Sequence, residues 1–317
     1  MSSAGASPEI PRLDTRSGYV TLVGRPNAGK STLLNALVGE RLSIVTPKAQ
    51  TTWQRVTGIA TTDGVQMIFL DTPGLLEPRD LLQEAMVASA ADALAEADVI
   101  LLVLDAADPR ALEGRGVMEN ALRKASGAPL VGAVNKIDRA KEPVADALSA
   151  WVEGELAGEA YRISALQEEG IDELRDRLGE LLPPGPYLYP PEDIARDPVR
   201  FFVAEMIRET VFQMYRQEIP YSVFCRVEEF RESQDPVYIQ AHIFVERKSQ
   251  KGILVGKGGS SIRTLGAKAR SKIEDFLQER VYLDLWVKVL PNWRRKRAEL
   301  KRLGFPVPDA TPGHEHP

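Results

Sequence analysis

The sequence predicts two domains of different fold, an α/β domain followed by a smaller α+β domain. Before residue 181, short apolar runs alternate with helical patterns, which is typical of a mostly parallel sheet covered by helices. Residues 181–198 then contain six prolines in eighteen positions. The charge changes sign there: residues 1–199 carry 19 Lys and Arg against 30 Asp and Glu, a net of −11, while residues 200–305 carry 21 against 13, a net of +8.

In the first domain, assigned to residues 18–182, four apolar runs are expected to be buried strands. They cover residues 19–24, 65–71, 99–105 and 129–136. A helix is expected from Lys30 to Gly39, and a longer one over residues 80–97. The order of these elements predicts an open sheet with helices on both faces.

Composition excludes several classes of protein. No apolar run of the 317 residues approaches the roughly 18 needed to span a bilayer, and the first residues lack the pattern of a secretory signal. Residues 1–17 are therefore expected to be a disordered leader. The single cysteine, Cys225, allows no intrachain disulfide, which fits a reducing cytoplasm.

Residues 183–198 are expected to form a stiff linker between the domains, because proline fixes φ and removes a backbone donor. A long loop inside one domain is the alternative. The change in the sign of the charge at this segment favours a linker.

The second domain, assigned to residues 199–305, has the predicted order α-β-β-α-α-β. Its positive charge indicates a partner that is a polyanion. Residues 306–317 are expected to be a disordered tail.

The segment "GRPNAGKS" at residues 24–31 matches the phosphate-binding motif G-x-x-x-x-G-K-[ST], between an expected strand and an expected helix. Backbone N–H groups of this loop and the helix N-terminus would surround phosphates. Lys30 would add a charge at the β- and γ-phosphates, and the Ser31 hydroxyl would bind Mg²⁺. The residues expected to contact nucleotide here are Gly24, Arg25, Pro26, Asn27, Ala28, Gly29, Lys30, Ser31 and Thr32.

Three later segments select the nucleotide. "DTPG" at 71–74 ends a strand, so that Asp71 would hold Mg²⁺ through water and the Gly74 N–H would meet the γ-phosphate; alone, it could be an ordinary turn. In "NKID" at 135–138, the Asp138 carboxylate can accept two N–H donors that guanine has and adenine lacks. Asn135 is expected to contact the base edge, and the Lys136 stem is expected to cover the ring. "ISA" at 163–165 can present a backbone N–H to the base oxygen. These segments predict GTP and add to the site Asp71, Thr72, Pro73, Gly74, Asn135, Lys136, Asp138, Ser164 and Ala165.

With these motifs, residues 18–305 resemble the Era family of Ras-like GTPases, within the translation-factor-related class. The resemblance rests on "GRPNAGKSTLLNALVGERLSIVTPKAQTTWQRVTGI", "DTPGL", "GPYLYPPE" and "GILVGKGGSSIRTLGAKARSKIEDFL". It implies that Thr52 completes the Mg²⁺ ligands and takes part in catalysis with Lys30 and Gly74, with Thr51 as a close competitor. Trp53 stands where the family usually has arginine.

Two positions bear on hydrolysis. Leu75 follows Gly74 where Ras has the glutamine that orients water, and a leucine cannot make that hydrogen bond, so slow hydrolysis is expected. Asn27 matches a position that helps related GTPases hold K⁺. A role in stabilising the loop turn is the alternative for Asn27.

A second glycine loop, "GILVGKGGSSI" at 252–262, lacks the phosphate-loop spacing. Gly256, Lys257, Gly258 and Gly259 form a G-x-x-G between two expected helices, which with the α-β-β-α-α-β order predicts a type II KH domain that binds single-stranded RNA. A simple helix corner is the alternative. The basic segment 292–303, which includes Arg294 and Arg295, is expected to extend the RNA surface or to contact anionic lipid.

The resemblance implies a GTPase that binds the 3′ end of small-subunit ribosomal RNA and assists assembly of the small ribosomal subunit. It implies a cytoplasmic protein with peripheral contact at the inner membrane, and a monomer is expected. The alternative is an RNA-binding module, or ribosomal RNA chaperone, whose nucleotide domain is only structural. A GTPase that modifies tRNA is disfavoured, because no catalytic cysteine motif is present.

Overall fold

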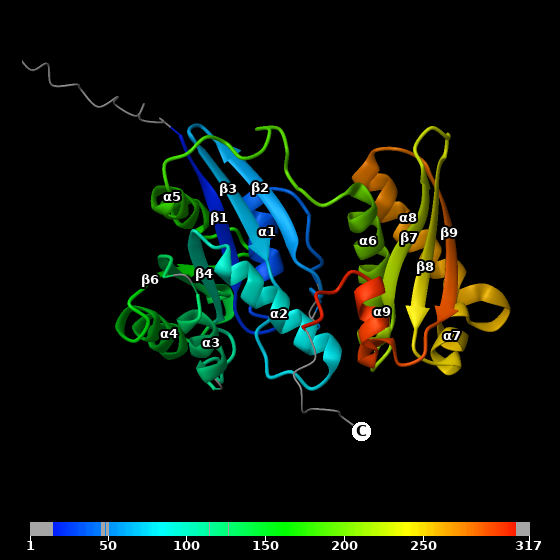
Figure 1. Ribbon diagram of the computed structural model, residues 1–317, viewed down its shortest axis with the longest axis horizontal. Coiled ribbons are helices and arrows are strands. Elements are labelled where there is room, and N and C mark those ends of the chain that lie inside the picture. Colours follow the sequence, from blue (N-terminus) through cyan, green and yellow to red (C-terminus); the bar gives the residue numbers. More distant parts are fainter. Residues whose placement is uncertain (1–14, 46–47, 49–50, 114, 126, 309–317) are drawn as a thin grey trace, which may run out of the picture.

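The computed structural model describes residues 15–45, 48, 51–113, 115–125 and 127–308, which form two domains side by side (Figure 1). The first domain has a six-stranded sheet in the order β2-β3-β1-β4-β5-β6. Only the β2 pairing with β3 is antiparallel. The strands are β1 (Arg16–Val23), β2 (Val56–Thr62), β3 (Val65–Asp71), β4 (Val99–Asp105), β5 (Leu130–Asn135) and β6 (Glu159–Ile163).

Helices cover both faces of this sheet, as the nearly continuous apolar strands require. One core contains α1 (Lys30–Val38) and α5 (Ile171–Leu181), and the core on the opposite face contains α2 (Leu81–Ala95), α3 (Arg115–Arg123) and α4 (Glu142–Gly154). The predicted α/β class is confirmed, and α1 stops at Gly39 in a left-handed conformation. The leader was expected to cover residues 1–17, but β1 already begins at Arg16; residues 1–14 lie outside the described residues.

Residues 183–198 are extended, but they lie against the first domain instead of crossing solvent. Pro184 pairs with Arg16, and Ala195 pairs with Gly58. The Ile59 N–H also donates to the Ile194 carbonyl at 2.8 Å. The linker therefore covers part of the sheet margin before the chain enters the second domain.

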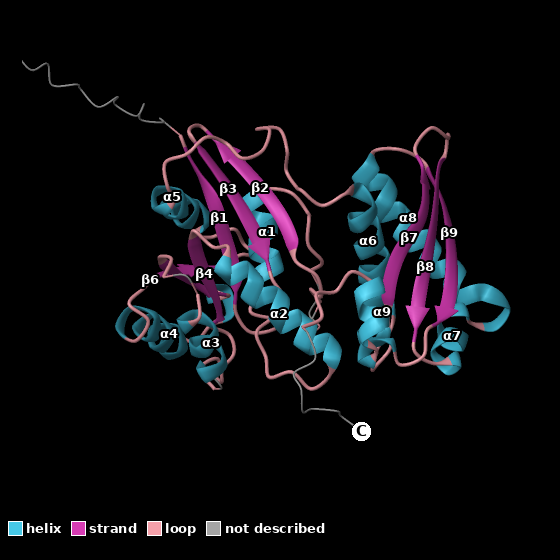
Figure 2. Ribbon diagram, viewed as in Figure 1, coloured by secondary structure: helices cyan, strands magenta, loops and turns pink. Residues whose placement is uncertain are grey.

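The second domain packs three of its helices on one face of a three-stranded sheet in the order β7-β8-β9 (Figure 2). β7 and β8 are antiparallel, and β8 and β9 are parallel. The chain order confirms the predicted α-β-β-α-α-β arrangement. Its elements are α6 (Val199–Met214), β7 (Phe224–Arg231), β8 (Val237–Val245), α7 (Lys248–Val255), α8 (Ser260–Leu277) and β9 (Val281–Val289).

The C-terminal segment joins the two domains. After β9 come a 3₁₀ turn, η4 (Trp293–Arg295), and helix α9 (Arg297–Arg302), which lies between α2 and the second sheet in Figure 1. Their buried cluster combines residues of the first domain with residues of the second, namely Trp53, Leu82, Ala85, Met86, Phe224, Phe244, Trp293, Leu300, Leu303, Phe305 and Val307. A disordered tail was expected to begin at residue 306. This prediction is wrong for Val307, whose side chain is buried in the cluster and so stabilises an ordered position. Residues 309–317 lie outside the described residues.

Within the part of the chain that the structure describes, none of the helices combines the length and the apolar character needed to cross a membrane.

Candidate functional site

The phosphate loop connects β1 to α1, and close packing against β5 requires its glycine at position 29. Gly29 has φ of 99°, and a Cβ there would lie 2.3 Å from Asn135 Nδ2. No side chain caps the N-terminus of α1, so its first N–H groups point into the loop. This is the arrangement in which a helix N-terminus binds a phosphate.

Lys30 places its ammonium group inside this loop. Nζ donates to the carbonyls of Gly24 and Arg25, at 3.2 and 3.1 Å. Burial lowers the pKa of Lys30 to about 8, while the nearby Asp71 carboxylate opposes that shift. The loop therefore holds a cation whose charge is poorly hydrated and available to an anion.

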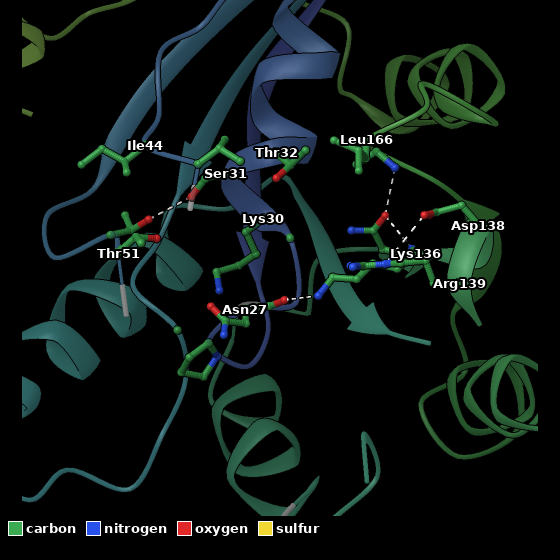
Figure 3. A pocket seen from close by; sticks show the side chains of 17 residues that line it. Asn27, Lys30, Ser31, Thr32, Ile44, Thr51, Lys136, Asp138, Arg139 and Leu166 are labelled. Atoms are coloured by element: carbon green, nitrogen blue, oxygen red, sulfur yellow. Dashed lines mark hydrogen bonds and ion pairs between the residues drawn. The ribbon is translucent and has the colours of Figure 1, made fainter. Parts of the chain in front are cut away.

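Hydroxyl oxygens meet at the start of α1 (Figure 3), and the Asp71 carboxylate lies beside them. Ser31 Oγ donates to Asp71 Oδ2 at 2.7 Å and lies 2.9 Å from Thr52 Oγ1. Ser43 Oγ, which sequence reasoning missed, donates to the same carboxylate oxygen at 3.1 Å. The nearest sequence signal for Ser43 was only its place in the loop after α1.

These oxygens fit a small divalent cation. Mg²⁺ prefers hard oxygen donors from one or two carboxylates or hydroxyls, together with water and phosphate. Asp71 Oδ1 is buried and has no hydrogen-bond partner in the described structure, so an acceptor remains available there. Burial raises the pKa of Asp71 from its usual value, against the lowering effect of Lys30 and the hydroxyl groups.

Thr51 and Thr52 have different partners. Thr52 Oγ1 lies 3.4 Å from Asp71 Oδ2, whereas the Thr51 carbonyl accepts a hydrogen bond from Arg208 on α6. The hydroxyl that meets Ser31 and Asp71 thus belongs to Thr52.

The expected base-binding residues gather at the other end of the same pocket. Asp138 follows β5 on a short 3₁₀ turn, and its Oδ1 accepts a hydrogen bond from Ser164 Oγ at 2.7 Å. Lys136 extends its stem across the pocket, and its Nζ donates to the Asn27 carbonyl and to Asp105 Oδ2, both at 2.6 Å. Asp105, at the end of β4, was not predicted.

Asn135 is placed differently from the expectation that it contacts the base edge. Its Nδ2 donates to the Ala28 carbonyl at 2.9 Å, and its Oδ1 accepts the N–H groups of Lys136 and Ala165. The side chain therefore links the phosphate loop to the base-binding loops. Within residues 163–165, which were expected to present a backbone N–H to the base oxygen, the Ala165 N–H is used in this link.

Two further residues of the predicted site, Thr72 and Arg25, have side chains that bond to backbone carbonyls. Thr72 is buried and donates to the Leu22 carbonyl at 2.7 Å, since the end of β3 faces the core there. Arg25 turns outward and donates to the Arg110 carbonyl at 2.8 Å. The side chains of Thr72 and Arg25 thus already have backbone partners, and contacts of these two residues with nucleotide stay predictions.

A pocket of about 370 Å³ joins the two ends of the site (Figure 3). Its volume lies in the range of small-molecule sites. Its lining brings together most of the predicted residues with some that were not predicted, namely Pro26, Asn27, Gly29, Lys30, Ser31, Thr32, Ile44, Val45, Thr51, Thr52, Gly74, Asn135, Lys136, Asp138, Arg139, Ala165 and Leu166.

Gly74 and Leu75 lie beside the phosphate loop. A Cβ on Gly74 would approach the Pro26 nitrogen to 2.6 Å, so only glycine fits this contact. Leu75 is buried in the core with Val23 and α2, and its N–H donates to the Gly24 carbonyl at 3.0 Å. The Leu75 side chain therefore contributes packing and no polar group.

The second glycine loop joins α7 to α8 through a 3₁₀ turn at Lys257–Gly259. Gly256, Gly258 and Gly259 all have positive φ, and Lys257 and Gly258 are exposed. The loop lies in the second domain, in the helix–loop–helix context that the KH prediction requires.

Arg294 and Arg295, predicted to contact RNA, have different surroundings. Arg294 Nη2 bonds Glu246 at 2.8 Å, and its Nη1 lies 3.9 Å from Asp80. The charge of Arg294 is thus already paired where the tail packs between the domains, and its contact with RNA stays a prediction. Arg295 is exposed.

Comparison with known proteins agrees with this architecture. A family model described as "50S ribosome-binding GTPase" matches residues 19–136, and one described as "KH domain" matches residues 218–294. GTPase Era of Carboxydothermus hydrogenoformans is 44% identical over 296 residues, which are 92% of this chain and 98% of that protein. GTPase Era of Leuconostoc citreum is 41% identical over 92% of this chain and 96% of its own length.

Two solved structures are similar over the same extent. Era in complex with MgGDPNP and nucleotides 1506–1542 of 16S ribosomal RNA has a TM-score of 0.86 and 36% identity, covering 92% of this chain and 99% of its own. A single-site variant of Era from Aquifex aeolicus, bound to GDP and aluminium fluoride, has a TM-score of 0.84 and 37% identity with the same coverage.

Fold and site together define a GTPase with a phosphate-loop domain and a C-terminal KH domain. The sequence similarity to the Carboxydothermus protein extends over 92% of this chain, and so through both domains and the linker between them. The chain belongs to the Era family of GTPases, and its activity is the hydrolysis of GTP to GDP and phosphate.

Proposed function

We propose that this chain uses Mg²⁺-GTP and binds the single-stranded 3′ end of small-subunit ribosomal RNA, and that it thereby assists assembly of the small ribosomal subunit. The convergence of Ser31, Thr52 and Asp71 beside Lys30 carries the proposal for the nucleotide. The structure with MgGDPNP and 16S RNA supports the same pair of ligands in a relative.

In this proposal, the phosphate-loop N–H groups and Lys30 bind the β- and γ-phosphates. Ser31, Thr52 and Asp71 would hold Mg²⁺, which withdraws charge from the phosphate oxygens when bound. The Gly74 N–H meets the γ-phosphate as its negative charge increases during transfer. These donors are fixed before the reaction, so they stabilise developing charge without having to reorganise.

Water must be oriented by groups other than residue 75. Leu75 points into the core and offers no donor or acceptor. Hydrolysis by the isolated chain is therefore slow, and a bound RNA or ribosomal surface that orders the pocket would accelerate it.

The exposed glycine loop supports an RNA ligand. Gly256, Gly258 and Gly259 leave space for a sugar–phosphate backbone, while Lys257 supplies positive charge. One matching family model is described as 50S-ribosome-binding, but it covers only residues 19–136, whereas the relative bound to 16S RNA is similar through the KH domain. The small subunit is therefore the proposed partner.

The protein acts as a cytoplasmic monomer in this proposal, with peripheral contact to anionic membrane lipid through the exposed basic side chains of the tail. Arg295, Lys296, Lys301 and Arg302 are exposed around η4 and α9. We also propose K⁺ near Asn27, whose φ of 67° equally suits a role in the loop turn.

Steady-state GTP turnover should be measured with and without an RNA that contains the 3′ end of small-subunit ribosomal RNA. The proposal expects Mg²⁺-dependent turnover that rises with this RNA and not with a scrambled sequence. Crosslinking of the GTP-bound protein in cells, with sequencing of attached RNA, should recover the same region. RNA binding that is indifferent to nucleotide, with no stimulated turnover, would favour the alternative of a structural nucleotide domain.

A further inference from the structure

One side chain of the second domain contacts both neighbours of Thr52. Arg208, on α6, donates from Nη2 to the Thr51 carbonyl. The same guanidinium lies 4.9 Å from the centroid of the Trp53 ring, within the range of a cation–π contact. Residues on either side of the predicted Mg²⁺ ligand are thus held by one group.

Arg208 is itself held in place. The residue is 1% exposed, its Nε donates to Glu205 Oε1 at 2.8 Å, and its Nη2 bonds Glu205 Oε2. The Phe212 ring lies 5.4 Å away. The buried Nη1 has no hydrogen-bond partner in the described structure, so the contacts of Nε and Nη2 are the ones that hold the guanidinium in one position. Breaking any of them would be costly, because a buried charge needs its partners.

Trp53 has a second contact with the same domain. Its ring centroid lies 5.7 Å from that of Trp293, which is fully buried and donates from Nε1 to the Ser222 carbonyl at 3.2 Å. Trp53 therefore lies between an arginine of α6 and a tryptophan of the C-terminal segment. These contacts anchor the backbone that carries Thr52 to the RNA-binding domain.

We propose that Arg208 is a positioning residue for Thr52 in GTP hydrolysis, supplied to the nucleotide site by the KH domain. The inference rests on the proposed role of Thr52 as a Mg²⁺ ligand. A loop that must place one hydroxyl within 3 Å of Ser31 loses conformational freedom when it does so. Contacts on both sides of that residue remove the freedom in advance, as preorganised sites require.

The test measures GTP turnover by the full chain as a function of GTP and Mg²⁺ concentration. Arg208→Met, which keeps an apolar stem of similar length, should lower kcat about tenfold, which corresponds to about 1.4 kcal/mol in the barrier. It should also raise the Mg²⁺ concentration needed for half-maximal rate, while GDP affinity stays near that of the wild type. Arg208→Lys should recover part of the rate, since an ammonium group can still donate to the Thr51 carbonyl.

A double-mutant cycle separates positioning from general stability. If Arg208 acts through Thr52, then Arg208→Met should cause no further loss in a chain that already carries Thr52→Ala. Arg41→Met is the matched control, because it removes another ion pair between the domains, that of Arg41 with Glu209. It should leave kcat and the Mg²⁺ dependence unchanged.

Wild-type kinetics for folded Arg208→Met, or a full additional loss in the Thr52→Ala background, would overturn the inference. Should Arg208→Met fail to fold, Trp53→Leu tests the same anchor, and it should show the same shift in Mg²⁺ dependence. A wild-type chain whose turnover does not depend on Mg²⁺ would count instead against the proposed function.

Discussion

Ser164 Oγ donates a hydrogen bond to Asp138 Oδ1 at 2.7 Å, across the two loops that follow β5 and β6. The bond fixes the plane of the carboxylate at the base end of the pocket. One carboxylate oxygen has a neutral hydrogen-bond donor, while the other lies 3.7 Å from Arg139 Nε. We therefore expect base selection to depend on a pair of residues from the loops that follow two different strands.

Asp138→Asn should weaken GTP binding and improve XTP binding. The carboxylate can accept from two guanine N–H groups, whereas the substituting amide offers one donor, which suits xanthine better. The loss for GTP should be about 2–3 kcal/mol, as for a charge-assisted pair of hydrogen bonds. Competition titrations with both nucleotides measure it, and an unchanged preference for GTP would contradict this assignment of Asp138.

Ser164→Ala serves as the companion variant. It leaves the carboxylate in place but frees its orientation, so GTP affinity should fall less than for Asp138→Asn, with no gain for XTP.

Lys30→Ala and Leu75→Ala should have opposite effects on GTP hydrolysis and on the free energy of unfolding. Removal of the Lys30 ammonium should abolish GTP hydrolysis with little loss of stability, because a buried charge is removed along with it. Leu75→Ala should leave kcat within a few-fold but should reduce the free energy of unfolding by about 2–5 kcal/mol, because it opens a cavity in the core. Single-turnover assays and denaturant titrations test the two effects separately, and a stable but inactive Leu75→Ala chain would show that this side chain acts in catalysis.

Replacing K⁺ with Na⁺ tests the proposed ion beside Asn27. If K⁺ contributes charge next to the phosphates, turnover should fall in Na⁺ at equal ionic strength and should become indifferent to the ion in Asn27→Asp or Asn27→Ala. Equal rates in the two salts would leave Asn27 with its loop role alone, for which its φ of 67° already gives a reason.

The lowered pKa of Lys30 predicts a pH dependence of binding. In the free protein Lys30 loses its proton near pH 8, whereas bound phosphates would raise that pKa. GTP affinity should therefore be full below about pH 8 and fall by up to about tenfold per unit above it, as linkage requires. Guanosine is the control, because it shares the ionisation of the base but lacks phosphates; if its affinity falls as steeply, the effect does not come from Lys30.

The parts of this molecule that follow a local rule could be predicted from sequence. The Lys30 loop, the strands that end at Asp71 and Asn135, and the order of elements in the KH domain each combine a short motif with a hydrophobic period. β2 was not assigned as a strand, because Val56–Thr62 lacks the nearly continuous apolar run of the assigned strands, although its threonines favour a strand.

Contacts between distant residues could not be predicted in this way. Asn135 was expected to contact the base, yet its side-chain amide joins the phosphate loop to Ala165. These partners depend on how three loops pack together, which no local pattern shows. Arg294 was assigned to RNA from the charge of the tail, since nothing local shows that Glu246 and Asp80 would lie beside it. Trp53 contacts Trp293 across 240 residues of chain, counted from their positions.

The structure of the second glycine loop determines how its RNA role can be tested. A Cβ on Gly258 would meet no atom within 4 Å, although φ is 58° there. Aspartate and asparagine tolerate this left-handed conformation better than most residues. Both can therefore replace Gly258 with similar backbone strain, and only aspartate adds charge.

Lys257→Asp with Gly258→Asp should lower affinity for single-stranded ribosomal RNA by at least about tenfold, which needs only about 1.4 kcal/mol. The change puts two negative charges where the phosphate backbone would lie and removes the positive one, so the remaining affinity should depend less steeply on salt. The matched control is Lys257→Asn with Gly258→Asn, which has the same shape and strain without the charge and should lose less. GTP affinity should stay unchanged in both, since the nucleotide pocket is lined by the other domain. Gel-shift titrations at two salt concentrations, with circular dichroism to verify folding, decide the outcome: a folded aspartate variant that binds RNA as the wild type does would mean that this loop is only a corner between α7 and α8.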